Sequence, residues 1–137
     1  PFRAAWRQAG EMDRARARER LQGCYITIPT MFRDPDLELN LPAMTRHVRW
    51  LMEHGIDAKY GTFLAGGAAG DFSTMTFDER LRVAETVVEA AGGQVPVAMG
   101  AQTTSTLELR RLASSELLLG GRVAEGLELV DGACVAP

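Results

Sequence analysis

Short apolar runs alternate with longer amphipathic stretches along most of the chain. The apolar runs lie at residues 24–29, 62–65 and 95–99, with a last one at about 132–135. Such runs are typical of buried strands. Between them, apolar residues recur at helical spacing at 41–52, 77–91 and 105–112, as expected for helices with one buried face. The pattern therefore predicts strands and helices in alternation.

The ends of the three predicted helices carry recognisable signals. A polar cap residue accepts a hydrogen bond from a free backbone N–H at the helix start, and glycine after the last turn ends the helix. In a capping box, a Glu three residues after the cap returns a bond to the cap residue. These signals are Asn40, Pro42 and Gly55 for the helix at 41–52, Thr76, Glu79 and Gly92 for the helix at 77–91, and Ser105 with Glu108 for the helix at 105–112.

The predicted order β-α-β-α-β-α-β with short loops places the chain in the α/β class. Strands linked by helices form a parallel sheet, here either a small open sheet or half of an eight-stranded barrel. From 114 to 126 the pattern weakens. Residues 1–20 interleave arginine with alanine and acidic residues, which predicts a solvated N-terminal helical extension. We therefore divide the chain into this extension, 1–20, and a strand-and-helix domain, 21–137.

Composition narrows the partners that can be expected. The chain has 137 residues, a net charge of -3 and 46% hydrophobic residues, which suits one globular domain. Without a basic excess to neutralise phosphates, no nucleic-acid partner is expected. No run approaches the roughly 20 apolar residues that span a bilayer and no signal peptide is visible, so no membrane partner and a cytoplasmic location are expected. Cys24 and Cys134 lie in apolar runs, which favours buried free thiols over a disulfide.

The glycine-rich stretch between the second strand and the second helix is the main candidate site. Gly66, Gly67 and Gly70 allow positive φ and a close approach to a ligand, and loops after parallel strands commonly carry sites. A phosphate loop is excluded because Asp71 follows Gly70 where that motif needs Lys. A dinucleotide fingerprint is disfavoured because Ala65 occupies its first glycine position.

Other polar residues offer weaker chemistry. Lys59 is the only lysine, and a desolvated lysine can attack a carbonyl, but it precedes the second strand and should lie at the opposite end of the sheet from the glycine loop. His47 and His54 have no further ligand at metal spacing nearby, so we expect surface residues and no metal site. No serine has a partner that would make a catalytic triad; the serines considered are Ser73, Ser105 and Ser115. The acidic loop is interpreted as solvated, and its carboxylates are Asp34, Asp36 and Glu38.

Two motifs resemble those of the dihydrodipicolinate synthase and N-acetylneuraminate lyase family. Residues 67–79, GAAGDFSTMTFDE, resemble the family's GTTGE(S)-x-T-L-x-x-x-E loop. Residues 97–106, VAMGAQTTST, resemble its third-strand signature, usually VIAGTGANST. The segment 30–32, TMF, is similar to the TPF turn after strand one, and 131–137, DGACVAP, is similar to strand four. The resemblance covers 21–113 and, less closely, 127–137.

This resemblance implies the N-terminal half of a (β/α)8 TIM barrel, about (βα)3β, with its site at the carboxyl ends of the strands. Members are class I aldolases without a cofactor, in which a lysine on strand six forms a Schiff base with pyruvate or a related 2-oxo acid and a tyrosine after strand five transfers protons. The loop after strand two receives the carboxylate. This implies carboxylate binding at Gly67, Ala68, Ala69 and Gly70, with Thr30 nearby, and a small-molecule substrate in a homo-oligomer.

The chain departs from the family pattern at informative positions. Ala68 and Ala69 stand where the family has two threonines, Asp71 replaces Glu, and Met31 replaces proline. Both ends look cut, and the chain stops before the strands that would carry the lysine and the tyrosine, so no catalytic residue is assigned. We therefore expect a fragment of a Schiff-base lyase or synthase. Alternatives are a non-catalytic half-barrel that dimerises or complements a partner, and a small open-sheet domain that binds an anion.

Overall fold

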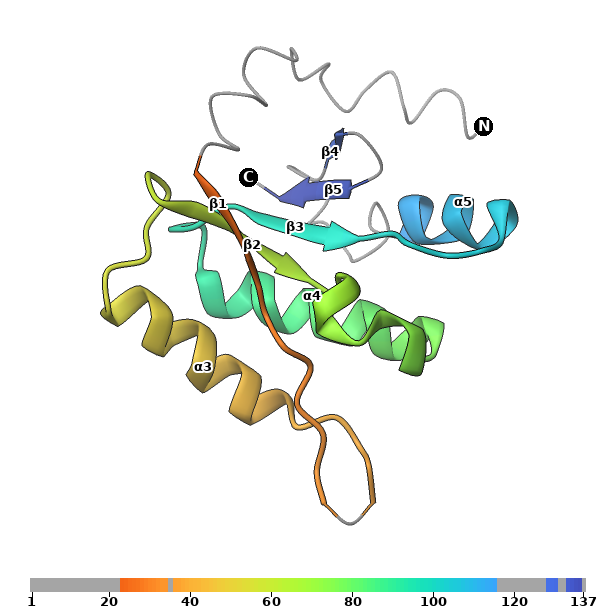
Figure 1. Cartoon of the computed structure of the whole chain (residues 1–137), viewed down its shortest axis with the longest axis horizontal. Helices are drawn as coiled ribbons and strands as arrows, with labels where there is room; N and C mark the ends of the chain where they lie inside the picture. Colours follow the sequence, from red (N-terminus) through yellow and green to blue (C-terminus); the bar gives the residue numbers. More distant parts are fainter. Residues whose placement is uncertain (1–22, 35, 116–127, 131–132, 137) are drawn as a thin grey trace.

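The computed structural model describes residues 23–34, 36–115, 128–130 and 133–136, and the side chains of 23–34 and 36–112. Its helices and strands alternate over most of this length, as the sequence pattern predicts (Figure 1). In chain order they are β1 (Cys24–Thr27), α3 (Leu41–Glu53), β2 (Gly61–Ala65), the 3-10 turns η1 (Ala68–Gly70) and η2 (Phe72–Thr74), α4 (Phe77–Ala91), β3 (Val97–Gly100), α5 (Thr106–Ser115), β4 (Glu128–Val130) and β5 (Ala133–Ala136).

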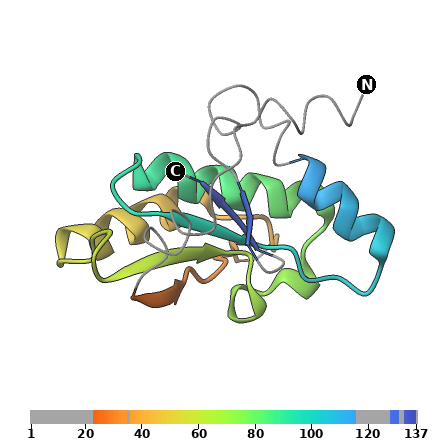
Figure 2. The same ribbon diagram turned by 90° about the horizontal axis from the view of Figure 1, so that it is seen from above.

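The first three strands form a parallel sheet, which confirms the predicted α/β class. β1 pairs with β2 and β2 with β3, both in parallel. α3 and α4 make the connections between these strands, and both lie on the same face of the sheet (Figures 1 and 2). Because the three strands run in the same direction, their carboxyl ends lie at the same end of the sheet.

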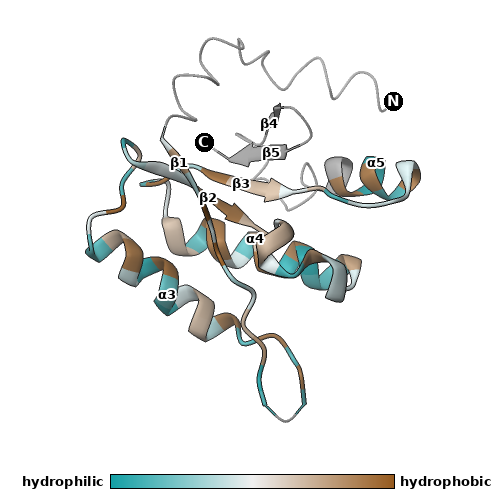
Figure 3. Ribbon diagram, viewed as in Figure 1, coloured by the Kyte–Doolittle hydropathy of each residue, from teal (hydrophilic) through white to brown (hydrophobic). Residues whose placement is uncertain are grey.

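The hydrophobic core lies between this sheet and the two helices. The register aligns Ile26 with Phe63 and Phe63 with Val97, so these side chains point to one face of the sheet. Figure 3 shows β2 and β3 as largely hydrophobic, whereas α3 and α4 carry both kinds of residue. The largest fully buried side chains are Phe63, Ile28, Met44, Leu112, Val48, Val83, Val87 and Val95.

The predicted helix ends are confirmed for α3 and α4. The Asn40 side chain accepts from the Ala43 backbone N–H at 3.2 Å, and Gly55 follows α3 with φ of 97°. At α4, Thr76 and Glu79 form both halves of the capping box, and Gly92 ends the helix with φ of 56°. Local sequence therefore sets where both helices start and stop.

The capping box predicted for α5 is formed in one half. The Glu108 backbone N–H donates to Ser105 Oγ at 3.3 Å. The Glu108 carboxylate instead accepts from Thr103 Oγ1 at 2.5 Å, and Thr103 Oγ1 accepts from the Ser105 backbone N–H. A nearby hydroxyl thus replaces the Ser105 backbone as partner of the carboxylate.

The last strand predicted from the sequence forms as β5, but the prediction that it continues the parallel sheet is wrong. Two strands follow α5, and the sheet order is β1-β2-β3-β5-β4. β5 pairs antiparallel with β3 and with β4. The sequence between β4 and β5 is Asp131-Gly132, a dipeptide typical of two-residue hairpins. That signal favours an antiparallel pair of β4 and β5, but it does not indicate which of the two strands lies beside β3.

The prediction that the first strand and its cysteine are buried is also wrong. β1 is half exposed, and Cys24 is an exposed free thiol. β1 stands at the end of the sheet order, so among the described residues it pairs with β2 alone. Tyr25 is accordingly 55% exposed. An apolar run cannot reveal whether its strand will be central or at an edge.

Several predictions fall outside the described part of the chain. The N-terminal helical extension at 1–20 and most of the segment 114–126 lie there, as does the Cys134 side chain. Among the helices that the structure does describe, none combines the length and apolar character that crossing a membrane requires.

We expect Thr76→Ala to lower the free energy of unfolding by about 1 kcal/mol, because it removes the α4 cap. The matched control is Thr86→Ala on the same helix. Thr86 Oγ1 only donates back to the Arg82 carbonyl at 2.7 Å, so this change should alter stability by less than about 0.5 kcal/mol. Urea denaturation measures both, and equal effects of the two changes would contradict the capping role.

The same cap should make stability depend on pH. The pKa of Glu79 lies below its ordinary value of 4.5, first because the Thr76 backbone N–H donates to the carboxylate and then because the Thr76 hydroxyl does. A carboxyl whose pKa is lowered by folding stabilises the fold above its unfolded pKa, and this contribution is lost as the pH falls through the folded value. The melting temperature of the wild type should therefore exceed that of Glu79→Gln at pH 6, and the difference should shrink towards pH 3. A difference that is constant with pH would refute this.

Candidate functional site

The loop after β2 follows a tightly defined path. Gly66 has φ of 57°, a left-handed conformation that glycine adopts without strain. The Gly70 N–H donates to the Gly67 carbonyl at 2.8 Å, closing the turn η1. Asp71 then takes φ of 56° between η1 and η2, which is uncommon for a residue with a side chain. Strained backbone of this kind gathers at functional loops.

Thr30 joins this loop to the end of β1. Its side chain is only 7% exposed, and its hydroxyl donates to the Gly70 carbonyl at 2.6 Å. The Ile28 N–H donates to the Leu64 carbonyl at 3.0 Å, continuing the pairing of β1 and β2 up to this point. The structure thus brings together Thr30 and the loop residues singled out from the sequence.

The end of β3 abuts the same loop. A Cβ atom placed on Gly100 would lie 2.5 Å from the Gly66 carbonyl oxygen and 2.8 Å from Gly67 Cα. Because both neighbours are backbone atoms, a side chain at position 100 would force the loop or the strand to move. The loop from Gly66 to Asp71 is therefore held between Thr30 on one side and β3 on the other.

The side chains at the centre of the loop are small. Ala68 and Ala69 are both exposed, whereas Gly67 and Gly70 on either side are buried. Methyl groups neither donate nor accept hydrogen bonds, so polar recognition by this stretch has to use backbone groups. Whether these residues bind a carboxylate stays a prediction.

Arg80 is a residue that the sequence analysis missed. It lies in the first turn of α4 and is only 3% exposed. One guanidinium nitrogen donates to the Gly100 carbonyl at 2.7 Å, and the group lies over the Phe72 ring, 5.4 Å from its centroid. Charged residues in helices are usually solvated, and no local pattern connects Arg80 with a carbonyl 20 residues further on.

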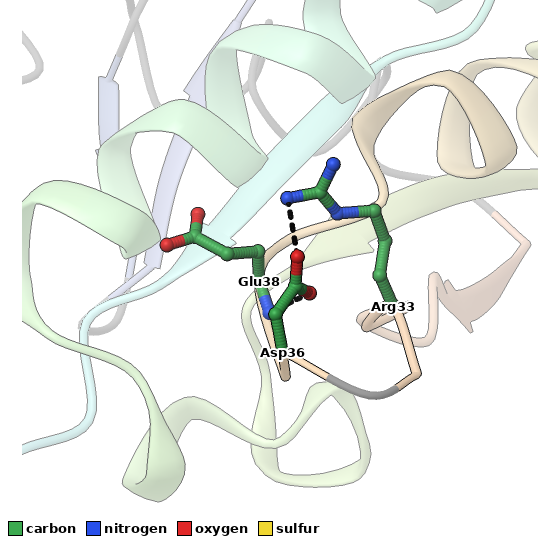
Figure 4. A network of polar contacts seen from close by, with 3 residues as sticks. All are labelled: Arg33, Asp36 and Glu38. Carbon is green, nitrogen blue, oxygen red and sulfur yellow. Dashed lines mark hydrogen bonds and ion pairs between the residues drawn. The ribbon is translucent and has the colours of Figure 1, made fainter.

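The acidic loop is solvated, as predicted. Arg33 and Asp36 form an exposed ion pair at 2.9 Å, and the Glu38 backbone N–H donates to the Asp36 carboxylate at 3.1 Å (Figure 4). The Glu38 side chain points away from this pair (Figure 4). Among the described residues, no group of three His, Cys, Asp or Glu residues could hold a metal ion.

The remaining candidate residues lie away from the loop. Lys59 is exposed before β2, at the opposite end of that strand from the loop, as predicted. His54 is exposed and His47 half-buried on or just past α3. Both rings stack with Trp50, with centroid separations of 6.5 Å for His47 and 4.1 Å for His54. Neither belongs to a cluster suited to metal binding within the described residues.

Comparisons with known proteins agree with the resemblance seen in the sequence. The family model described as "Dihydrodipicolinate synthetase family" matches residues 21–121. The chain is 32% identical over 100 residues to a 4-hydroxy-tetrahydrodipicolinate synthase of Methylococcus capsulatus, covering 73% of this chain and 33% of the relative. It is 34% identical over 109 residues to the enzyme of the same name from Thiobacillus denitrificans, covering 80% of this chain and 34% of the relative.

A third relative shows the same partial coverage. 4-Hydroxy-tetrahydrodipicolinate synthase 1 of Halalkalibacterium halodurans is 40% identical over 77 residues, which are 56% of this chain and 24% of the relative. The chain thus spans about a third or less of the curated relatives named here. Since the family model covers most of its length, the chain belongs to the dihydrodipicolinate synthetase family.

Proposed function

We propose that this chain supplies the first part of an eight-stranded barrel whose site binds the carboxylate of pyruvate or a related 2-oxo acid. The residues proposed to receive the carboxylate are Gly67, Ala68, Ala69 and Gly70, with Thr30 fixing the loop. The observation that carries the proposal is the buried 2.6 Å hydrogen bond from Thr30 to the Gly70 carbonyl. It joins the ends of two parallel strands where barrel enzymes have their sites.

A carboxylate suits this loop for chemical reasons. It accepts hydrogen bonds and presents no donor, so backbone N–H groups can bind it. Ala68 and Ala69 are exposed and carry only methyl side chains. Because the Gly70 N–H already donates to the Gly67 carbonyl, the donors proposed for a small acid are the N–H groups of Ala68 and Ala69. The two hydroxyls that the family usually places here are absent.

The covalent chemistry is proposed to use residues outside these 137. Lys59 is the only lysine in the chain, and it lies at the opposite end of β2 from the loop. A Schiff base between a lysine and the keto group of the acid would therefore need an amine from another strand of the barrel. The reaction class proposed is aldol cleavage or condensation, or dehydration. The partners proposed are the 2-oxo acid and further copies of the same protein.

A second candidate function is a pairing module, and the exposed strand β1 favours it. Cys24 and Tyr25 are exposed at the start of β1, which pairs with β2 alone among the described strands. An open strand edge is a template for another chain. Such a module would need no substrate, so a test for substrate capture separates the two candidates.

Pyruvate with sodium borohydride should trap a covalent adduct on the full-length protein. Reduction makes the Schiff base irreversible, and mass spectrometry detects the adduct. The Lys59→Arg variant should be trapped to the same extent, because Lys59 is exposed and distant from the loop. Absence of any adduct in the wild type would reject the aldolase proposal and leave the pairing module. An adduct on Lys59 would reject the proposed position of the site.

Replacing Thr30 with valine should weaken capture. The change removes the hydroxyl that donates to Gly70, so we expect the free energy of unfolding to fall by about 1 kcal/mol. The pyruvate concentration for half-maximal trapping should rise several-fold, and Thr30→Ser should restore most of it. Thr45→Val is the matched control, since Thr45 Oγ1 donates within α3 to the Leu41 carbonyl. If the two valine variants trap pyruvate alike, Thr30 has no role at the site.

A further inference from the structure

Arg80 occupies a position where a cation is costly. Its side chain is 3% exposed, and taking a charge out of water is unfavourable unless hydrogen bonds replace the lost hydration. It also lies in the first turn of α4, and helix N-termini disfavour positive charge. An apolar side chain would fill this space at a smaller electrostatic cost. A role beyond packing would explain the choice of arginine.

Arg80 contacts two residues that adjoin the loop after β2, one beside its start and one just past its end. Its guanidinium donates to the Gly100 carbonyl at 2.7 Å, and Gly100 abuts Gly66 and Gly67 at the start of the loop. The same group lies 5.4 Å from the centroid of the Phe72 ring, and Phe72 follows directly on Asp71. One side chain thus connects the strand beside the loop with the residue that follows the loop.

We propose that Arg80 is a positioning residue, which holds the loop from Gly66 to Asp71 against the end of β3 and thereby sets the affinity for the carboxylate without contacting it. The ligand in this proposal rests on the proposed function, whereas the positioning of the loop does not. The chemistry of arginine suits the task, because a planar guanidinium can donate a hydrogen bond and stack on a ring at the same time. The ammonium of lysine keeps the charge and a donor but lacks the planar stacking surface.

The test compares Arg80→Met, Arg80→Lys and Arg82→Met in the full-length protein. Arg82 is exposed on the same helix, so its methionine variant controls for loss of a positive charge from α4. Amide hydrogen exchange reports the loop directly and requires no ligand. Borohydride trapping across a pyruvate series reports binding of the carboxylate. Methyl pyruvate, which lacks the carboxylate charge, controls for general damage to the site.

In Arg80→Met, exchange of the amides from 66 to 72 should accelerate. Half-maximal trapping should need several-fold more pyruvate, because a loop that is no longer held in place must be ordered when the carboxylate binds. The methyl pyruvate concentration for half-maximal trapping should rise less than the pyruvate concentration does. Arg80→Lys should recover part of both losses, and Arg82→Met should match the wild type.

The proposal is overturned if Arg80→Met lowers the melting temperature while loop exchange and pyruvate half-saturation stay within twofold of the wild type. If Arg80→Met does not fold, Arg80→Gln, which lacks the charge and the guanidinium, takes its place, and wild-type loop exchange in that variant overturns the proposal equally. If the wild type captures no pyruvate, the proposed function fails, and the exchange comparison still decides whether Arg80 positions the loop.

Discussion

Parallel pairing of β1, β2 and β3 is the constraint on which the rest of this structure depends. Parallel neighbours cannot be joined by a tight turn, so the chain must cross back along the sheet after each strand. α3 and α4 make these crossings on one face and supply one wall of the core. The carboxyl ends of the strands then collect at one edge, where the loop after β2 meets Thr30 and Gly100. The geometry of the site is thus a product of strand direction.

The parts of the fold governed by local chemistry could be predicted from the sequence. Thr76 with Glu79 fixes the start of α4, and Gly92 fixes its end, because caps act on backbone groups within a few residues. Sheet order is not local in this sense. An apolar run does not reveal whether its strand has one neighbour or two, and for this reason the exposure of Cys24 was missed. The direction of β5 was missed because the apolar run at 132–135 does not by itself reveal which way its strand runs.

The residues of the candidate site also differ in whether the sequence could predict them. Glycine positions reveal the loop, because few other residues tolerate its backbone conformation. The placement of Thr30 beside Gly70 was expected from the family resemblance, while the hydrogen bond between them is information only the structure holds. Arg80 could not be found from its own surroundings, since an arginine in a helix rich in Glu and Arg is expected to face water. Its partners, Gly100 and Phe72, come from two other segments of the chain.

The close approach of Gly100 to Gly66 and Gly67 has a consequence for how such a site can diverge. Backbone atoms meet there with no room for a Cβ, so the loop cannot keep its path if position 100 acquires a side chain. Ala68 and Ala69, in contrast, project from the exposed side of the loop and can be exchanged without disturbing that contact. Substitution can therefore change the chemical groups offered to a ligand while the main-chain frame is inherited intact. Alanine at the two positions where the family resemblance implies threonine is a change of this permitted kind.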